Sequence, residues 1–553
     1  MRKRTGLLII LFISLFTSGY TYAQSDLYYN ISKSIDMFGR VYKEISQKYV
    51  DDIDPKEFML AGIEGMLSDL DPYTVYIDET DQQDIDVITT GKYGGIGTTV
   101  GVRNGKVTII DLIEGYSAQR QGMRIGDVIL KIDSVKITPK NYDELSAYMK
   151  GTPGTEVSVT VQRDGVEGNI IFNLVREEVE INNLTYYGFL PEESNNVYLK
   201  LSGFSRAAGE EIKDAIMELR KEREIKSIIL DLRGNPGGLL DAAIDVSEKF
   251  LPKNELIVSV RGRDSLNVKE YYSEEEPIAG DAKLIVLIDG GSASASEIVA
   301  GAIQDHDRGV IMGTPSFGKG LVQTVIPMSN TTSLKITTAR YYTPSGRCIQ
   351  KIDYSNDNDV VLPTALLDQE EFRTDRNRKV FSGGGIQPDT LIDNQSGSDL
   401  VRDLIAQGAF FRFATHYYNV NEITDWNSVD REQLFNSFKT YFDENKVDFS
   451  SRSERLLKEL EELAKDEDYG NQIDDELAQL KQSLNDIKTN ELDMFKDDVI
   501  AELHQEIAAR IEGRKGRIRA SLLYDGQYKS SLKLMDSYKT YDSLLALADQ
   551  SQQ

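Results

Sequence analysis

The spacing of apolar side chains predicts helices in the first part of the chain. Between residues 26 and 70, apolar positions recur every three or four residues, as on one face of a helix. The members of this pattern are Ile31, Ile35, Phe38, Val41 and Ile45, followed by Phe58, Leu60, Ile63 and Leu67. Asp71-Pro72 stops the second run, because a residue before proline is pushed out of the helical region.

Short β-like runs dominate from about residue 85 to residue 177. The clearest are Val107–Ile113, Val128–Ile132 and Val157–Gln162. One helical stretch, Tyr142–Met149, interrupts them. We therefore expect a small β-rich module in this part of the chain.

Strand-like and helix-like runs alternate from about residue 195 to residue 345. The order is a strand at Ser227–Asp231, a helix at Leu239–Phe250, a strand at Leu284–Asp289, a helix at Ser296–Gln304 and a strand at Val310–Met312. Such alternation is typical of a layered α/β core.

Residues 400–553 are helical in pattern and highly charged. Apolar positions repeat there at a spacing of 4-3-4-3, at Ile473, Leu477, Leu480, Leu484 and Ile487. Two heptads are too few to indicate a coiled coil, and packing within a helical hairpin explains them as well.

Length and charge limit the classes of protein that the chain can belong to. A chain of 553 residues is too long for one hydrophobic core, so we expect three or more units. The formal net charge of −27 argues against nucleic acid or anionic lipid as a partner, because phosphate groups are bound by clustered Lys and Arg.

The first residues have the features of a secretion signal. A positive MRKR segment precedes the apolar run Leu7–Phe16, and Thr21-Tyr22-Ala23 offers a small-residue cleavage site before Gln24. We expect export, most simply to the periplasm, with an uncleaved membrane anchor as the alternative. The single thiol, Cys348, can form no internal disulfide and belongs to no metal-binding cluster of cysteines.

A serine-rich run, Gly290–Glu297, joins an apolar strand to a helix. A serine at a helix N-terminus lies beside unpaired N–H groups that can stabilise an oxyanion. Plain N-capping, with a Glu in the first turn, also fits the run. However, three serines that alternate with alanine exceed what a cap requires.

A nucleophilic serine needs a base, and the three histidines are poorly placed to act as one. His306 lies twelve residues after Ser294, which is about 18 Å along a helix. His416 and His504 fall in the charged helical tail. Capping or surface roles suit all three better than the role of the base.

Lysine is the remaining candidate base. Lys319 lies between Gly318 and Gly320, and burial can lower a lysine pKa from about 10.4 by several units. Gln323 would lie on the same face of the following strand and could orient the amine. A solvated loop lysine is the plain alternative.

Two other motifs overlap this segment. Gly313 to Lys319 fits the first part of a phosphate-binding P-loop, but Gly320 replaces its Ser or Thr, and a strand-like run follows where a helix is needed. Ser316-x-x-Lys319 matches one penicillin-binding motif, but its companions Ser-Asp-Asn and Lys-Thr-Gly do not occur.

Taken in order, several motifs make the chain resemble the carboxyl-terminal processing peptidases, or tail-specific proteases, over roughly residues 30–395. The matching segments are Leu70–Thr74, Tyr93–Gly97, Gly126–Ile129, Asp231–Gly238, the Ser/Ala run, Phe317–Gln323, Thr338–Gly346 and Gly385–Asp389. The resemblance implies Ser294 as the nucleophile, Lys319 as the base and Gln323 as the residue that positions the base. It also implies an oxyanion hole made by the backbone N–H groups of Ala295 and Gly237.

The same resemblance makes residues 85–177 look like a PDZ module. Its loop Gly94-Gly95-Ile96-Gly97 would offer backbone N–H groups to a terminal carboxylate, and a strand edge beside it could pair with the peptide. A simple glycine-rich turn is the alternative. Tyr116-Ser117-Ala118 replaces the Ser-Pro-Ala of many relatives, so we expect a difference in how the module docks or in which peptides it prefers.

We therefore expect a multidomain α/β (α+β) protein with a crotonase-like protease core and an inserted PDZ-like domain. The expected parts are a signal peptide at 1–23, N-terminal helices at 24–84, the PDZ-like domain at 85–177, the Ser/Lys protease core at 178–395 and a helical region at 396–553. The expected activity is that of a serine endopeptidase that processes C-terminal regions of exported proteins without a metal or an organic cofactor.

An exported, non-catalytic PDZ scaffold is the alternative. Peptides or proteins with accessible C-termini are the expected partners, and an adaptor or a second copy of the chain is left open.

Overall fold

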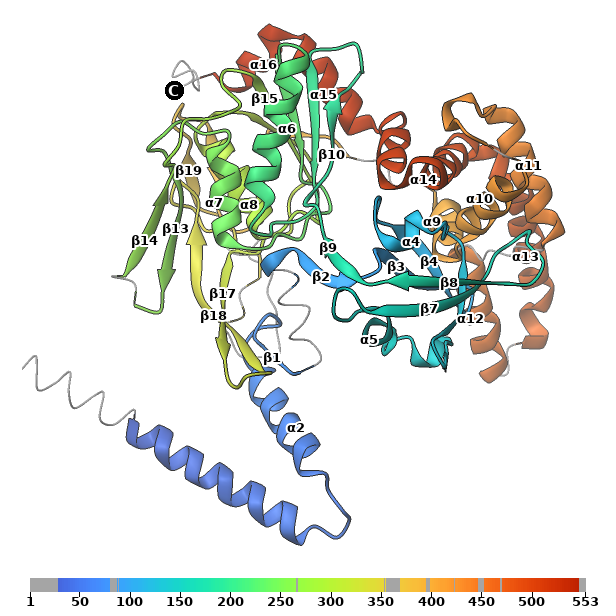
Figure 1. Ribbon diagram of the computed structural model, residues 1–553, viewed down its shortest axis with the longest axis horizontal. Helices are drawn as coiled ribbons and strands as arrows, with labels where there is room; N and C mark the ends of the chain where they lie inside the picture. Colours follow the sequence, from blue (N-terminus) through green and yellow to red (C-terminus); the bar gives the residue numbers. More distant parts are fainter. Residues whose placement is uncertain are drawn as a thin grey trace, which may run out of the picture. The chain divides into compact units, whose positions relative to one another are not determined.

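The computed structural model describes residues 28–79, 87, 89–264, 267–352, 354, 369–393, 398–421, 423–445, 452–467 and 470–546 (Figure 1). The predicted signal peptide lies outside them. Two compact units divide the chain. The first takes in the residues up to Glu79 and the segment Gln323–Thr337, and the second holds the remaining β-rich, α/β and helical parts.

The N-terminal unit contains the two predicted helices, at residues 28–48 and in α2 (Pro55–Leu67). Asp54 caps α2 by accepting hydrogen bonds from the first backbone N–H groups of the helix. In the same unit, β1 (Val75–Ile77) pairs antiparallel with the first half of β18 (Ser333–Tyr342). The strand β17 (Leu321–Pro327) also pairs with β18.

The β-rich module in the second unit is a twisted antiparallel sheet in the order β3-β4-β5-β7-β8, with β6 paired to β5. Its elements are β3 (Thr98–Arg103), β4 (Lys106–Leu112), α4 (Ser117–Arg120), β5 (Val128–Ile132), β6 (Val135–Lys136), η1 (Pro139–Asn141), α5 (Leu145–Met149), β7 (Glu156–Gln162) and β8 (Asn169–Val175). The helix begins three residues later than predicted, because the short η1 turn and Tyr142 precede it. Where the chain enters and leaves the module, β2 (Lys92–Gly95) pairs with β9 (Glu177–Glu180).

The α/β core is a six-stranded sheet in the order β10-β11-β12-β15-β16-β21. Its strands are β10 (Leu184–Phe189), β11 (Asn196–Leu201), β12 (Ser227–Asp231), β15 (Lys283–Ile288), β16 (Val310–Gly313) and β21 (Thr390–Leu391). All neighbours pair in parallel except β10 and β11. Parallel strands of this kind are covered on both faces, which explains their continuous apolar sequences.

Helices cover both faces of this sheet. One face packs against α6 (Ala208–Glu222), α7 (Leu240–Glu248) and α8 (Ala295–Asp305) (Figure 1). The other face packs against the end of α14 (Lys496–Leu522), α15 (Gly526–Asp536) and α16 (Tyr538–Leu544). Along β12, Ile228 and Leu230 join the first cluster and Ile229 the second, as the two-residue period of a strand requires.

Shorter strands flank the core. The second half of β18 pairs with β13 (Leu256–Gly262), which pairs in turn with β14 (Val268–Tyr272). A separate hairpin is formed by β19 (Glu371–Arg373) and β20 (Lys379–Phe381).

The region after residue 398 is helical, as predicted. Before α14 it contains α9 (Asp399–Ala406), α10 (Ala409–Val420), η3 (Trp426–Ser428), α11 (Arg431–Glu444), α12 (Arg452–Asp466) and α13 (Gly470–Met494). The helices α12 and α13 pack against each other. None of the helices in the described part of the chain is both long and apolar enough to cross a membrane.

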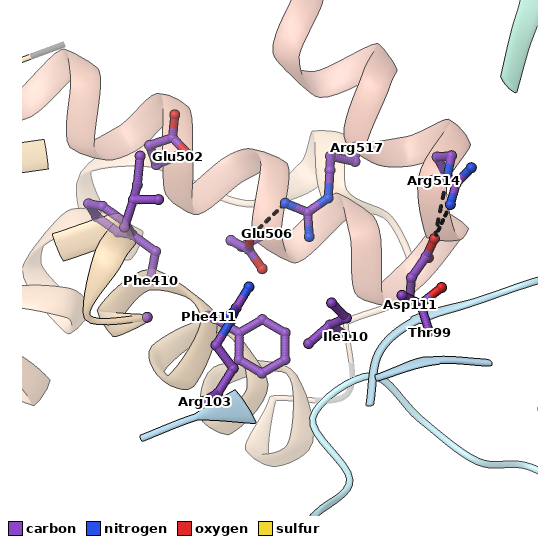
Figure 2. Close-up of a pocket in the computed structure, with 12 residues that line it drawn as sticks. Thr99, Arg103, Ile110, Asp111, Phe410, Phe411, Glu502, Glu506, Arg514 and Arg517 are labelled. Atoms are coloured by element: carbon purple, nitrogen blue, oxygen red, sulfur yellow. Dashed lines mark hydrogen bonds and ion pairs between the residues drawn. The ribbon is translucent and has the colours of Figure 1, made fainter. Parts of the chain in front are cut away.

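The helical region contacts the β-rich module directly. A pocket of about 450 Å³ separates β3 and β4 from α10 and α14, and Figure 2 shows Arg514 reaching across to Asp111 at 2.7 Å. Elsewhere in the interface, Asp164 pairs with His416 at 2.9 Å. The Cα of Gly126 lies so close to Thr415 that an added Cβ would come within 2.4 Å of its methyl group.

Candidate active site

The serine-rich loop connects the buried strand β15 to helix α8. Ser294, the last residue before the helix, has φ +54° and ψ −111°, a conformation that non-glycine residues rarely adopt. Oδ1 of Asp289 accepts hydrogen bonds from the backbone N–H groups of Gly291 (2.9 Å) and Gly234 (2.8 Å). The hydrogen bonds to Asp289 therefore hold the loop in place, while the backbone of Ser294 is strained. This combination is common at catalytic residues.

Glu297, in the first turn of α8, joins the serine loop to the lysine loop. Its side chain is fully buried. Oε2 accepts hydrogen bonds from the backbone N–H groups of Ser294 (2.8 Å) and Lys319 (2.9 Å). Oε1 accepts from the N–H of Gly318 (2.7 Å) and from Oγ of Ser316 (2.5 Å). Burial raises the pKa of Glu297 to about 7, although these four donors favour the ionised form.

Tyr341, on β18, makes a second connection between the two loops. Its side chain is almost fully buried, and its hydroxyl donates to the backbone carbonyls of Ser294 (3.2 Å) and Lys319. Burial and the nearby charge of Glu297 raise the pKa of Tyr341 well above its usual value, so the hydroxyl keeps its proton. Ser294 and Lys319 thus share one carboxylate and one phenol.

The two predicted oxyanion residues lie side by side but differ in their hydrogen bonds. Gly237 has φ +101°, and a Cβ there would come within 3.0 Å of the backbone nitrogen of Ala295. The N–H of Gly237 donates to Oδ1 of Asn235 at 2.9 Å. The N–H of Ala295 has no acceptor among the described residues. Ala295 therefore offers a free donor at the end of α8, whereas Gly237 offers an occupied one.

A buried ion-pair network anchors the turn that carries Gly237. Asp231 pairs with Lys200 (3.1 Å) and Arg233 (2.6 Å), and Arg233 also pairs with Asp525 (2.7 Å), which caps α15. Burial favours the protonated form of Asp231, but the two cations outweigh it and hold its pKa below the usual range. The turn is thereby fixed to the face of the core sheet that packs against α15.

The surroundings of Lys319 disagree with both competing motifs. The strand β17, and not a helix, follows the lysine, so neither the P-loop nor the penicillin-binding arrangement is present. Ser316 is buried and bonded to Glu297, which removes it as an exposed nucleophile. Lys319 itself is partly buried.

Gln323 lies on β17 and belongs to the N-terminal unit. Within that unit, its Nε2 donates to Oγ1 of Thr337 at 3.2 Å. This bond fixes the amide group on the β17–β18 pair.

The histidines have structural contacts away from Ser294. His306 caps the opposite end of α8. His416 pairs with Asp164, and His504 is buried beside Trp426. The prediction that none of them is well placed as the base agrees with these positions.

His306 also belongs to the one group of three potential metal ligands found in the described ranges, with Glu255 and Asp375. Its Nδ1 lies 2.8 Å from Oδ2 of Asp375, and its Nε2 lies 2.7 Å from the carbonyl oxygen of Leu256. Burial lowers the pKa of His306, but the carbonyl and the carboxylates outweigh it and raise the pKa. The raised pKa favours the protonated imidazole, which can donate from both ring nitrogens to these two oxygens.

The predicted carboxylate-binding loop consists of the last two residues of β2 and the two residues that connect it to β3. Gly94 and Gly95 pair with β9, so their backbone belongs partly to a ladder. The backbone N–H groups of Ile96 and Gly97 find no acceptor in the part of the chain that the structure describes. Two unpaired N–H groups at the end of an edge strand suit a terminal carboxylate.

A groove of about 360 Å³ begins at this loop. It runs between the edge strand β3 and helix α5, and its lining includes Ile96, Val100, Tyr142 and Met149. The larger pocket of Figure 2 differs, because two of its three arginines are in ion pairs, Arg514 with Asp111 and Arg517 with Glu506. The groove is the better candidate for a peptide.

Fold and site together combine a strained serine at a helix N-terminus with a separate β-rich module that carries a groove beside an edge strand. Comparison with known families agrees. The model of peptidase family S41 matches residues 195–360 and a PDZ domain model matches residues 108–163. The C-terminal helical domain of a probable PDZ-protease matches 400–535, and the N-terminal domain of the activating protease CtpB matches 18–81.

Curated relatives carry names of the same kind. The chain is 38% identical to a carboxy-terminal-processing protease of Bartonella bacilliformis over 337 residues, 60% of this chain and 76% of that protein. It is 31% identical to the carboxy-terminal processing protease CtpB of Bacillus subtilis, over 64% of this chain and 70% of that one. Among solved structures, the photosystem II D1 C-terminal processing protease is similar at 26% identity over 65% of this chain and 87% of that chain, with a TM-score of 0.35. The protein belongs to peptidase family S41, the carboxy-terminal processing serine proteases.

Three residues of this site were not predicted as members of it. Glu297 was interpreted only as a first-turn acid, and neither Asn235 nor Tyr341 stood out beyond the motifs that contain them. The spacing of Glu297 from Ser294 was the one available signal, because a Glu three residues after a serine can reach back to its N–H.

Proposed function

We propose that this protein is an exported endopeptidase in which Ser294 is the nucleophile and Lys319 the general base. The observation that carries the proposal is the shared contact of the two loops. Ser294 and Lys319 donate their backbone N–H groups to one oxygen of Glu297 and contact one hydroxyl of Tyr341.

The proposed chemistry is acyl transfer. Nζ of neutral Lys319 takes the proton from Oγ of Ser294 as Oγ attacks the carbonyl carbon of the peptide bond. The oxyanion that forms is stabilised by the free N–H of Ala295, and by Gly237 if its N–H turns from Asn235. Lys319 passes its proton to the leaving amine. Water then attacks the ester carbonyl and gives a proton to Lys319, and Ser294 recovers its proton as the acid departs.

Gln323, on the strand that follows Lys319, is proposed to orient the amine of that lysine. The PDZ domain is proposed to hold the C-terminus of the substrate, with its carboxylate at Ile96 and Gly97. The loop Gly94-Gly95-Ile96-Gly97 and the open edge of β3 support this role.

Cleavage of an unstructured polypeptide by the purified full-length protein tests the catalytic assignment. Ser294→Ala and Lys319→Ala are expected to abolish cleavage. Lys319→Arg is expected to do the same, because a guanidinium does not lose its proton near neutral pH. Lys253→Ala, at an exposed position, is the matched control. Cleavage by all variants would discard this site, and peptide binding without cleavage by the wild type would favour a scaffold.

Export rests on the N-terminal sequence. The mature protein is expected to begin at Gln24 and to collect outside the cytoplasm, in the periplasm of a cell with two membranes. Fractionation and N-terminal sequencing check both points. An intact N-terminus in the membrane fraction would favour an anchor instead.

A further inference from the structure

The edge strand β3 is the strand that a bound peptide would extend. It has a neighbour, β4, on one side only, and α5 lies across the groove from its other side. A peptide that adds to such an edge pairs its own N–H and C=O groups with those that point outward from the strand.

The pairing of β3 with β4 identifies which groups point outward. Val100 lies opposite Ile109. The N–H of Ile109 donates to Asp127 (2.9 Å) and its carbonyl accepts from Gly126 (2.8 Å), so both groups of Ile109 turn toward β5. Val100 and Ile109 are therefore a pair without mutual hydrogen bonds, in which the backbone groups face away from each other. The carbonyl of Val100 points to the open edge.

That carbonyl is already occupied by a side chain from across the groove. The hydroxyl of Tyr142 donates to the carbonyl oxygen of Val100 at 3.0 Å. Tyr142 directly follows η1, whose turn is held by hydrogen bonds between Thr138 and Asn141, so its backbone is fixed. The ring thus spans from the helix side of the groove to the edge of β3.

We propose that Tyr142 is a gate on the PDZ groove, whose hydroxyl competes with the backbone of the substrate for the carbonyl of Val100. This inference rests on the proposed role of the groove as the binding site for C-termini. A strand added to β3 lies about 4.8 Å away. A hydroxyl 3.0 Å from the carbonyl oxygen stands inside that space.

The distance between the carboxylate loop and Val100 determines which peptide residue competes with Tyr142. A carboxylate held at Ile96 and Gly97 lies three to four residues from Val100 along the chain. At about 3.3 Å per residue, a peptide anchored there reaches Val100 with about its third residue from the end. The N–H of that residue must replace the hydroxyl of Tyr142, so the gate lowers affinity for every peptide that pairs in this way.

Removing the hydroxyl while keeping the ring tests the gate. In the full-length Ser294→Ala protein, Tyr142→Phe is expected to bind a fluorescent peptide with a free C-terminus about two to ten times more tightly, the range of one net hydrogen bond. Tyr148→Phe is the matched control, because Tyr148 lies on α5, which borders the groove, and its hydroxyl donates to Glu144 (2.7 Å) instead of to Val100. Its affinity is expected to equal that of Ser294→Ala alone.

Two modified peptides separate this inference from the proposed function. A C-terminal amide tests the carboxylate loop, and its binding as tightly as the free acid would overturn the proposed function of the groove and the gate with it. A peptide N-methylated at the third residue from its end cannot donate to Val100, so the gain from Tyr142→Phe is expected to disappear. Preference for the free acid with no gain in Tyr142→Phe, or an equal gain for the N-methyl peptide, would overturn the gate alone. Equal melting temperatures of the variants verify folding.

Discussion

The backbone N–H groups of Ser294 and Lys319 donate to the same atom, Oε2 of Glu297, at 2.8 and 2.9 Å. The two nitrogens therefore cannot be further apart than the sum of these two hydrogen bonds. Because both loops are otherwise separate in the chain, Glu297 fixes the backbone from which nucleophile and base project.

Replacing this carboxylate is expected to reduce cleavage strongly. Glu297→Gln keeps the shape but offers one oxygen, so two of the four donors face an NH₂ group. Each buried donor left without an acceptor costs about 1–3 kcal/mol, and we expect kcat to fall at least tenfold. Peptide affinity at the PDZ groove, measured in the same protein, serves as the control and is expected to be unchanged. An unchanged kcat would show that the two loops are held without Glu297.

The pKa of Glu297 also predicts how stability depends on pH. The folded chain holds this proton up to pH about 7, whereas the unfolded chain releases it near the usual glutamate pKa of 4.5. Between these values the folded state binds more protons, so stability falls as pH rises, by up to about 3 kcal/mol through this group. Urea unfolding at pH 5 to 8 is expected to show this loss in the wild type and not in Glu297→Gln. Parallel curves for the two proteins would contradict it.

Tyr341→Phe is expected to loosen the same two loops without breaking the core. The ring stays buried, and only the hydroxyl that contacts Ser294 and Lys319 is lost. We expect kcat to fall about tenfold, with KM little changed, because no substrate group contacts the hydroxyl in this account. Steady-state kinetics check this, with Tyr272→Phe as the control at an exposed hydroxyl. A change confined to KM would contradict a positioning role.

The order of elements in the core could be predicted because its strands are buried on both faces. Ser227–Asp231 was predicted with its observed bounds, since a continuous apolar run followed by a helical run has few other interpretations. The motif around Lys319 likewise placed β17 correctly. The pattern of apolar residues within one segment is thus enough to predict the type and bounds of the element that the segment forms.

Contacts between distant segments could not be predicted in this way. Glu297 reaches Gly318 and Lys319 only because the strand order β15-β16 brings their loops together. The packing of α15 against the core sheet could not be predicted either, because nothing in the charged C-terminal sequence indicates which surface this helix contacts. The hydrogen bond from the hydroxyl of Tyr142 to the carbonyl of Val100 could not be predicted either. The sequence pattern places Tyr142 in the helix, which begins three residues later.

Gly97→Ala is expected to weaken peptide binding at the carboxylate loop. Gly97 has φ +78°, and a Cβ would come within 2.5 Å of Cβ of Tyr116, so the loop must move. We expect at least a tenfold loss of affinity for a peptide with a free C-terminus, measured by fluorescence polarisation. Gly105→Ala, with φ +69° but open space around it, is the matched control for backbone strain and is expected to bind normally. Equal losses in both variants would point to strain rather than to the loop.

Gly126→Ala is expected to loosen the contact between the PDZ domain and the helical region. An added Cβ would come within 2.4 Å of the side chain of Thr415 on α10, whereas at Gly122, which also has a positive φ, it meets nothing within 4 Å. Both substitutions strain the backbone by about 1–2 kcal/mol, so their difference isolates the contact. Hydrogen exchange is expected to be faster along α10 in Gly126→Ala than in Gly122→Ala, because the two surfaces must separate. Equal protection of α10 in the two variants would mean that this contact contributes little to holding the helical region on the PDZ domain, and that other contacts, such as the hydrogen bond between His416 and Asp164, hold it instead.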